Sequence, residues 1–340
     1  MKLENAFKHR SIWLGFAMIA IVLYHSQFWS DSSLYSFFKQ YGYAGVDICL
    51  FASGIGCYYS LEKDPDVLAF LLRRLRKLAP AYFCVMVVWV LWRAALDPMP
   101  ISGIVSCFLG LATYVSWDYH LNWYIGGLVL FYFLMPYFKR ITDSFRTIWG
   151  DILAVAVLVM LAISFWNQNM IIYSRLPVCY LGVVCGKLAK RGLVLNRWHY
   201  LLVGLSAIAG GALLHFCVTC LPDLLWNQGL WWYPLFAVTP GVCLALSLLG
   251  EVLEKHRVLR WLYRLLEMMG IYSFELYLVH IFLYERVMPH VQPMLPDIPH
   301  NLLWSMTVPV IIAGCFLLNR TASAVYFLFT KASKKLAKVL

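Results

Sequence analysis

Five ionisable residues interrupt long apolar stretches of the sequence. They are His25, Asp47, Arg93, Arg175 and His280. A histidine can take up a proton near neutral pH, a carboxylate can orient the ring and stabilise its charged form, and an arginine can stabilise negative charge. Ionisable groups in apolar surroundings usually mark a functional site or a buried pair. The five residues therefore suggest proton-transfer chemistry or a path for an ion.

Each of these residues also has a purely structural explanation. A lone histidine such as His25 on an apolar helix can be held by an ordinary hydrogen bond. Asp47 could form a neutralised buried pair with either Arg93 or Arg175. Glu285 and Arg286 follow at the end of an apolar stretch, where we expect their charged groups to extend toward water.

The composition indicates which elements position these residues. Of 340 residues, 62% are hydrophobic and only 13% are charged, whereas a soluble domain is about half apolar and a quarter charged. This excludes a water-soluble globule, a collagen, a disordered chain and a DNA-binding domain. The net charge of +11 is typical of basic loops retained on the cytoplasmic side of a membrane. We predict an all-α, polytopic membrane helix bundle.

Apolar stretches long enough to cross a bilayer, about 20 residues each, predict ten transmembrane helices. They cover 11–29, 42–60, 78–96, 122–138, 151–167, 171–189, 198–220, 230–250, 267–288 and 301–320. With both termini cytoplasmic, all but four of the 28 lysines and arginines fall on the cytoplasmic side. The basic residues counted there include Lys187.

One more apolar segment, 101–116, is expected to be re-entrant or interfacial. Counting it as a span would move Lys139 and Arg140 to the outside, against the distribution of positive charge.

Helix rise places the five ionisable residues at one level. At about 1.5 Å per residue, all five come about 20 to 24 Å from the inner edge of a hydrocarbon core about 30 Å thick. Glu275 comes at about 12 Å. We therefore expect the five side chains to share a polar cavity in the outer half of the membrane.

The end of the chain is expected to form a separate unit. Residues 1–320 are predicted to be a single membrane-embedded domain, followed by a cytoplasmic tail over 321–340. In this tail, lysines at helical spacing lie on the opposite side of the helix from the apolar positions. This pattern predicts a basic amphipathic helix on the inner leaflet. They are Lys331, Lys334, Lys335 and Lys338.

Ten cysteines are present, and Cys217 and Cys220 alone have the C-x-x-C spacing. No second pair and no histidine at ligand spacing accompany them, so no metal site is expected. A disulfide and two unpaired cysteines both remain open.

Six segments together resemble acyltransferase family 3, a family of integral membrane proteins. The first, W-L-G-F-A-M-I-A-I-V-L-Y-H-S, carries His25, and the second, Y-A-G-V-D-I-C-L-F-A-S-G-I-G, carries Asp47. In order, the six lie at 13–26, 43–56, 72–82, 122–136, 175–187 and 270–280. The resemblance implies an O-acyltransferase of the cell membrane that moves an acyl group, acetyl by default, from acyl-CoA to a surface glycan or a lipid-linked precursor.

The same resemblance implies roles for individual residues. His25 would act as the general base, Asp47 would orient it, and Arg175 would contact the oxyanion or the acceptor. The phosphates of acyl-CoA would meet a cytoplasmic basic run, Arg73, Arg74, Arg76 and Lys77. Substrate contacts are expected at Arg93, Trp123, Glu275 and His280. No metal and no nucleic acid are implied, and the basic run could instead be only a topology signal.

The sequence departs from the family pattern at three places. Leu14 stands where many members have an arginine, and Arg10, one helical turn earlier on the same face, is a candidate to replace it. Lys77 stands where arginine is commoner, and the glutamate that many relatives have near Trp123 is absent. These differences indicate a divergent branch.

Two other classes of function are consistent with the residues. The intramembrane charges could form the ion or substrate path of a transporter or channel, although no internal repeat supports this. A scaffold or sensor without catalysis would make Leu14 a sign of lost activity.

Overall fold

The computed structural model describes residues 1–340 except 117–120, 122, 165–169, 222–231 and 337–340. These described residues form helices and no named strand, and Lys2 and Val194 make a single isolated antiparallel bridge. The predicted all-α class is therefore confirmed.

The α-helices are α1 (Leu3–Ala6), α2 (Arg10–His25), α3 (Ser33–Tyr41), α4 (Gly45–Lys63), α5 (Val67–Leu96), α6 (Ile101–Phe108), α7 (Ala112–Val115), α8 (Trp123–Ser144), α9 (Ile148–Ser164), α10 (Met170–Tyr173), α11 (Leu176–Lys190), α12 (Arg197–Cys220), α14 (Leu235–Lys255), α15 (Arg260–Ile271), α16 (Ser273–Ile281), α17 (Met288–Val291) and α18 (His300–Leu336). Short 3₁₀ turns are η1 (Phe7–His9), η2 (Gly42–Ala44) and η4 (Gln292–Met294), and η3 (Phe282–Val287) is a π-helical turn.

Local sequence signals explain several helix ends. Pro177 stands in the first turn of α11, where its missing N–H costs no hydrogen bond. Gly192, just after α11, has φ +78°, a conformation that favours glycine. The Asn196 side chain then accepts hydrogen bonds from the backbone of Trp198 and His199 and caps α12.

Seven of the described helical segments are long and apolar enough to cross a membrane. They are Leu3–His25, Ser33–Lys63, Val67–Leu96, Met170–Lys190, Arg197–Cys220, Leu235–Lys255 and His300–Phe327. An eighth results if Arg260–Ile271 and Ser273–Met294, bent by 70°, form one span. The protein is a multi-pass membrane protein, and both the count of ten and the side on which the termini lie stay predictions.

The segment 101–116 does not form a membrane-spanning helix. It contains α6, of eight residues, and α7, of four. Eight helical residues extend only about 12 Å, less than half of the hydrocarbon core. Gly110, with φ +70°, stands between the two helices.

The chain divides into two compact units. The first contains Met1–Ile21, Gln40–Phe70 and Gly127–Ile271, and the second contains Val22–Lys39, Leu71–Gly126 and Tyr272–Leu340.

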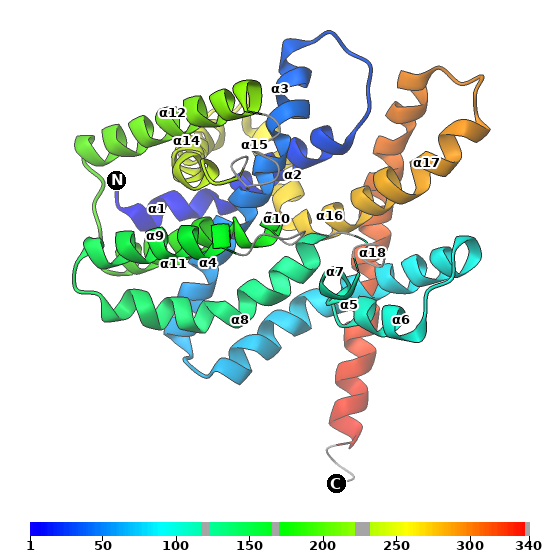
Figure 1. The fold of residues 1–340 in the computed structure, drawn as a ribbon, viewed down its shortest axis with the longest axis horizontal. Coiled ribbons are helices and arrows are strands. Elements are labelled where there is room, and N and C mark those ends of the chain that lie inside the picture. Colours follow the sequence, from blue (N-terminus) through cyan, green and yellow to red (C-terminus); the bar gives the residue numbers. More distant parts are fainter. Residues whose placement is uncertain (117–120, 122, 165–169, 222–231, 337–340) are drawn as a thin grey trace. The chain divides into compact units, whose positions relative to one another are not determined.

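Within the first unit, α4 packs closely against α11 (Figure 1), and the order of their contacts, Gly54 with Gly182 and Tyr58 with Gly186, follows the same chain direction in both. A Cβ atom at Gly54 would lie 2.4 Å from the carbonyl oxygen of Cys179, and one at Gly182 would lie 2.3 Å from that of Phe51. Only glycine permits this approach of the two backbones, as in small-residue contacts between other membrane helices.

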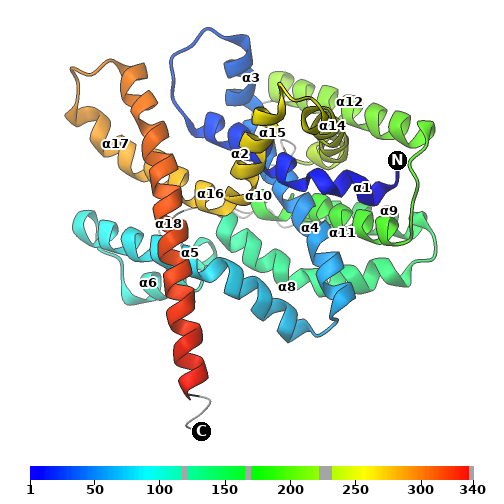
Figure 2. The same ribbon diagram turned by 180° about the vertical axis from the view of Figure 1, so that it is seen from behind.

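Within the second unit, α16 packs against α18 (Figure 2). Val279 fills the space over Gly314, and Thr307 Oγ1 donates a hydrogen bond of 3.1 Å to the hydroxyl of Tyr284. The predicted tail from 321 onward is the continuation of α18, which runs without a break to Leu336. Its position on the inner leaflet stays a prediction, and residues 337–340 lie outside the described part of the chain.

Candidate active site

The second unit brings His25 and Glu285 together. His25 is the last residue of α2, and its Nε2 lies 3.3 Å from Oε1 of Glu285. The side chains are 19% and 33% exposed. The expectation that Glu285 only extends toward water is wrong, because its carboxylate contacts the imidazole.

The π-helical turn η3 explains how Glu285 reaches this position. Residues five apart project in clearly different directions from an α-helix, which has 3.6 residues per turn. A π turn closes hydrogen bonds from i to i+5 and brings such residues toward one side. Glu285 lies within η3, which begins at Phe282, two residues after His280, and both Glu285 and His280 contact His25.

His280 is the second neighbour of His25. Their ring centroids are 5.3 Å apart, and the His280 side chain is fully buried. Nδ1 of His280 lies 2.8 Å from the carbonyl oxygen of Leu276. A carbonyl can only accept, so Nδ1 carries the proton and Nε2 of the neutral ring has the lone pair. That nitrogen has no hydrogen-bond partner among the described residues.

Trp123 is connected to His280 through aromatic contacts within the same unit. It meets Tyr124 edge to face at 6.1 Å, and Tyr124 lies 4.6 Å from the ring of Tyr277. Tyr277 in turn contacts His280 at 5.4 Å. These ring contacts link Trp123 to the imidazole pair.

A basic cavity of about 510 Å³ lies between α5, α16 and α18 of the second unit. Arg73, Arg76 and Lys77 line it, at positions i, i+3 and i+4, which share one face of a helix. Arg74 is not among the lining residues, so three of the four basic residues predicted to bind phosphate share this cavity. Glu275 lines it too.

Arg93 has its own partners on α5. Its Nη2 lies 2.7 Å from Oδ2 of Asp97, one turn further, and its guanidinium lies 5.8 Å from the ring of Trp89. A shared cavity for all five ionisable residues of the apolar stretches stays a prediction.

The first unit holds the pair of Asp47 and Arg175. Nε of Arg175 lies 3.4 Å from Oδ2 of Asp47, and each side chain is only 1% exposed. Nη1 of Arg175 donates a 2.6 Å hydrogen bond to the carbonyl of Ile171, and the guanidinium lies 5.5 Å from the ring of Trp232. Of the two arginines that could neutralise Asp47, the structure selects Arg175.

A second buried ion pair, which the sequence did not indicate, also lies in the first unit. Lys187 Nζ donates to Oδ2 of Asp151 at 2.7 Å and to the carbonyl of Thr142 at 2.6 Å. The other oxygen of Asp151 accepts from Thr142 Oγ1 and from the Tyr180 hydroxyl. Lys187 is therefore buried, although it lies near a helix end, and it ties α11 to α8 and α9.

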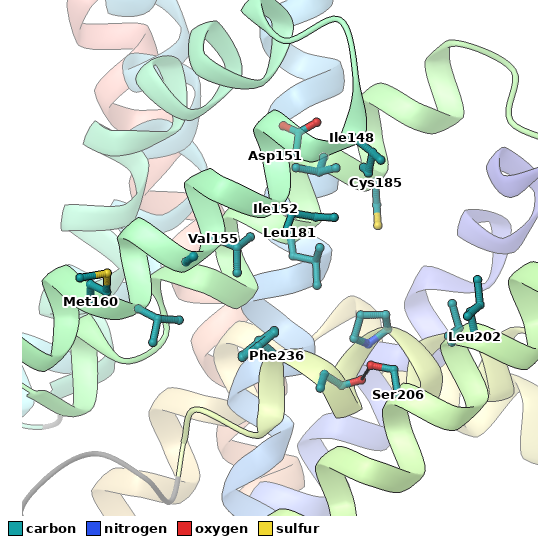
Figure 3. Close-up of a pocket in the computed structure, with 16 residues that line it drawn as sticks. Ile148, Asp151, Ile152, Val155, Met160, Leu181, Cys185, Leu202, Ser206 and Phe236 are labelled. Carbon is teal, nitrogen blue, oxygen red and sulfur yellow. Dashed lines mark hydrogen bonds between the residues drawn. The ribbon is translucent and has the colours of Figure 1, made fainter.

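An apolar groove of about 770 Å³ runs along α9, α11, α12 and α14 in the first unit (Figure 3). Val155, Met160 and Phe236 are typical of its lining, and none of the lining residues is basic. Its two polar side chains bond elsewhere, Asp151 to Lys187 and Ser206 to the carbonyl of Ala237. This surface has no group that could hold an anionic substrate and suits hydrocarbon chains.

The C-x-x-C pair forms no disulfide. Cys217 is buried, Cys220 is exposed, and both are free thiols. Of the alternatives left open by the spacing, the structure supports two unpaired cysteines.

Comparison with known proteins identifies the family. The model of acyltransferase family 3, described as an acyltransferase domain, matches residues 15–320. Neither the curated proteins nor the solved structures contain a match to this chain. Since the matched range covers nearly the whole sequence, the chain belongs to acyltransferase family 3 and is a membrane acyltransferase.

Proposed function

We propose that this acyltransferase moves an acyl group, acetyl in the simplest case, from acyl-CoA to a hydroxyl of a cell-surface glycan or of its lipid-linked precursor in the cell membrane. One observation carries the proposal: a histidine in contact with a carboxylate shares a unit with a cavity that holds three cationic side chains. The first feature suits acid–base catalysis, and the second suits an anionic donor.

His25 is the general base in this proposal. With the proton on Nε2 directed to the Glu285 carboxylate, Nδ1 takes the proton of the acceptor hydroxyl. The hydroxyl oxygen attacks the thioester carbonyl carbon, the carbon–sulfur bond breaks, and the thiolate leaves with the proton from the imidazolium. Glu285 stabilises the imidazolium during the step. The buried Nε2 of His280 can accept a hydrogen bond from a hydroxyl group of the glycan substrate.

The donor is held through its phosphates. Arg73 and Arg76 present planar guanidinium groups, which match phosphate oxygens in a fork-like geometry, and Lys77 adds a compact charge. Asp47 and Arg175, which were candidates for orienting the base and contacting the oxyanion, have the geometry of a neutralised pair. We propose that this pair holds α4 against α11.

Membership in an acyltransferase family favours acyl transfer over the transporter or channel alternative. The experiment is a thioester-consumption assay on the purified, membrane-reconstituted protein, combined with mass spectrometry of surface glycans in cells with and without the gene. We expect thiol release from acetyl-CoA and an acyl mass difference on the glycan.

His25→Ala supplies the decisive comparison. General-base catalysis typically contributes about 100-fold or more, so the variant should lose transfer while retaining normal expression and membrane insertion. If His25→Ala retains more than about a tenth of the activity, His25 is not the essential base.

A further inference from the structure

We infer that Glu275 and Asn319 recognise the uncharged, amide-containing arm of the donor thioester and so determine donor specificity. The inference rests on the proposed acyl-CoA donor and extends it to a pair of residues outside the basic run. Such a donor has two parts with different chemistry: a phosphorylated head and a neutral arm that carries amide groups and ends in the thioester.

Glu275 and Asn319 form one hydrogen-bonded group in the wall of the basic cavity. Nδ2 of Asn319 donates a 3.1 Å hydrogen bond to Oε1 of Glu275. Glu275 comes from α16 and Asn319 from α18, and both line the cavity together with the three cations of α5. The bond orients Oε1 of Glu275 toward Asn319. Oε2 of Glu275 and Oδ1 of Asn319 are the other hydrogen-bond acceptors of the pair.

The lining of the cavity carries charges of both signs. Phosphate oxygens are attracted by Arg73, Arg76 and Lys77 and repelled by the carboxylate of Glu275. A carboxylate in this position discriminates against a second anion and favours neutral N–H donors. The amide N–H groups of the donor arm have this chemistry, and hydrogen bonds to a charged acceptor are stronger than neutral ones.

Helix geometry connects this pair to the imidazoles. Glu275 and His280 stand on the same helix, five residues apart, which corresponds to about 7.5 Å along the axis. His280 contacts His25. The two side chains project about 140° apart around α16, so an arm held at Glu275 must pass around the helix as well as along it for its thioester to reach His25.

The cavity also extends past its cations on the side of α5. Pro80 and Ala81 line it beyond Lys77 and offer no charge or hydrogen-bond donor. Next to Pro80 and Ala81 a charged head group has no group to pair with, whereas the apolar carbon atoms of a neutral arm can pack there. A free phosphate or a lipid phosphate could occupy the cationic region, but neither would need Glu275.

The test uses the full-length protein in membranes and two donors. One is acetyl-CoA, and the other is an acetyl-CoA analogue whose two arm amides are replaced by esters, which keep the carbonyls but lack the N–H groups. Glu275→Gln keeps the shape of the side chain and removes its charge. We expect this variant to raise KM for acetyl-CoA about tenfold, as the loss of about 1.4 kcal/mol in charge-assisted bonding requires. KM for the ester analogue should change by less than about twofold, and kcat should stay close to the wild-type value.

Two comparisons distinguish this specificity role from others. Arg76→Gln should raise KM for both donors equally and weaken inhibition by inorganic phosphate, which Glu275→Gln should leave unchanged. Thr321→Ala is the matched control on α18, because Thr321 is exposed and bonds to the Leu317 carbonyl of its own helix. It should behave as wild type.

The inference is overturned if Glu275→Gln changes KM for both donors by the same factor, or lowers kcat alone. Should Glu275→Gln fail to accumulate in the membrane, Asn319→Ala takes its place, with the same selective increase expected for acetyl-CoA. If the wild-type protein consumes neither donor, the proposed function itself fails. If instead the wild type uses both donors and Glu275→Gln changes KM for both equally, only the inference about Glu275 fails.

Discussion

The carboxylate of Glu285 lies 3.3 Å from Nε2 of His25, and Glu285 belongs to the π-helical turn η3 between α16 and α17. A carboxylate beside one imidazole nitrogen fixes the ring and stabilises its protonated form, which is the arrangement that a general base requires.

Glu285→Gln tests this contact directly. The amide keeps the size and a hydrogen bond but cannot stabilise the imidazolium by charge. We expect kcat to fall roughly 10- to 100-fold, with KM for acetyl-CoA changed little. Glu4→Gln, at an exposed position in α1, is the control and should leave kcat unaltered. An unchanged kcat in Glu285→Gln would mean that the contact between Glu285 and His25 only anchors α2.

Comparing Arg76 with Arg74 distinguishes phosphate binding by the basic run from a topology signal. Arg76 lines the basic cavity, whereas Arg74 does not. Arg76→Gln should raise KM for acetyl-CoA several-fold more than Arg74→Gln, and the difference should shrink at high salt because charges are screened. Initial-rate measurements at two ionic strengths test this. Equal KM values, together with inverted topology reporters in both variants, would favour a topology signal instead.

The contact between α4 and α11 predicts a stability effect with an internal control. A methyl group at Gly54 would overlap the Cys179 carbonyl, so Gly54→Ala should lower the free energy of unfolding by about 1 to 3 kcal/mol. Gly204, in α12, has open space around its Cα. Gly204→Ala should be neutral or slightly stabilising, because alanine is the better helix former. Thermal unfolding in detergent measures both, and equal melting temperatures would contradict the close packing.

The buried pair of Asp151 and Lys187 predicts strong coupling. Lys187→Met leaves the Asp151 carboxylate buried without its cation, which should cost about 3 to 5 kcal/mol. Adding Asp151→Leu should recover a large part of this loss, since an apolar pair of similar volume is often tolerated. The double-mutant cycle is measured by thermal unfolding. Additive effects of the two substitutions would show that the pair does not act as a unit.

The pattern of apolar residues and the depth of each residue along its helix predict much of this structure. The apolar stretches identify the helices, and helix rise puts His25, Asp47, Arg175 and His280 at one level. From this set the structure joins His25 with His280 and Asp47 with Arg175. The spacing of Arg73, Arg76 and Lys77 also explains why Arg74 is left out of the cavity, because Arg74 projects from a different face of α5.

The residues that sequence reasoning missed lie where regular periodicity fails. Glu285 becomes a partner of His25 through a π turn, and no pattern of 3.6 residues reveals such a turn. Lys187 stands near a helix end, where lysine is usually solvated, yet tertiary packing buries it against Asp151. Its burial depends on contacts with α8 and α9, which are distant in the sequence.

The glycine contact between α4 and α11 also limits how the length of these helices can change. Asp47 stands seven residues before Gly54, and Arg175 stands seven residues before Gly182. A one-residue insertion or deletion inside either interval would turn one charge by about 100° around its helix while the glycines stay in contact. The other charge would then be buried alone. Insertions and deletions should therefore be tolerated only outside both intervals, or as matched changes in the two helices.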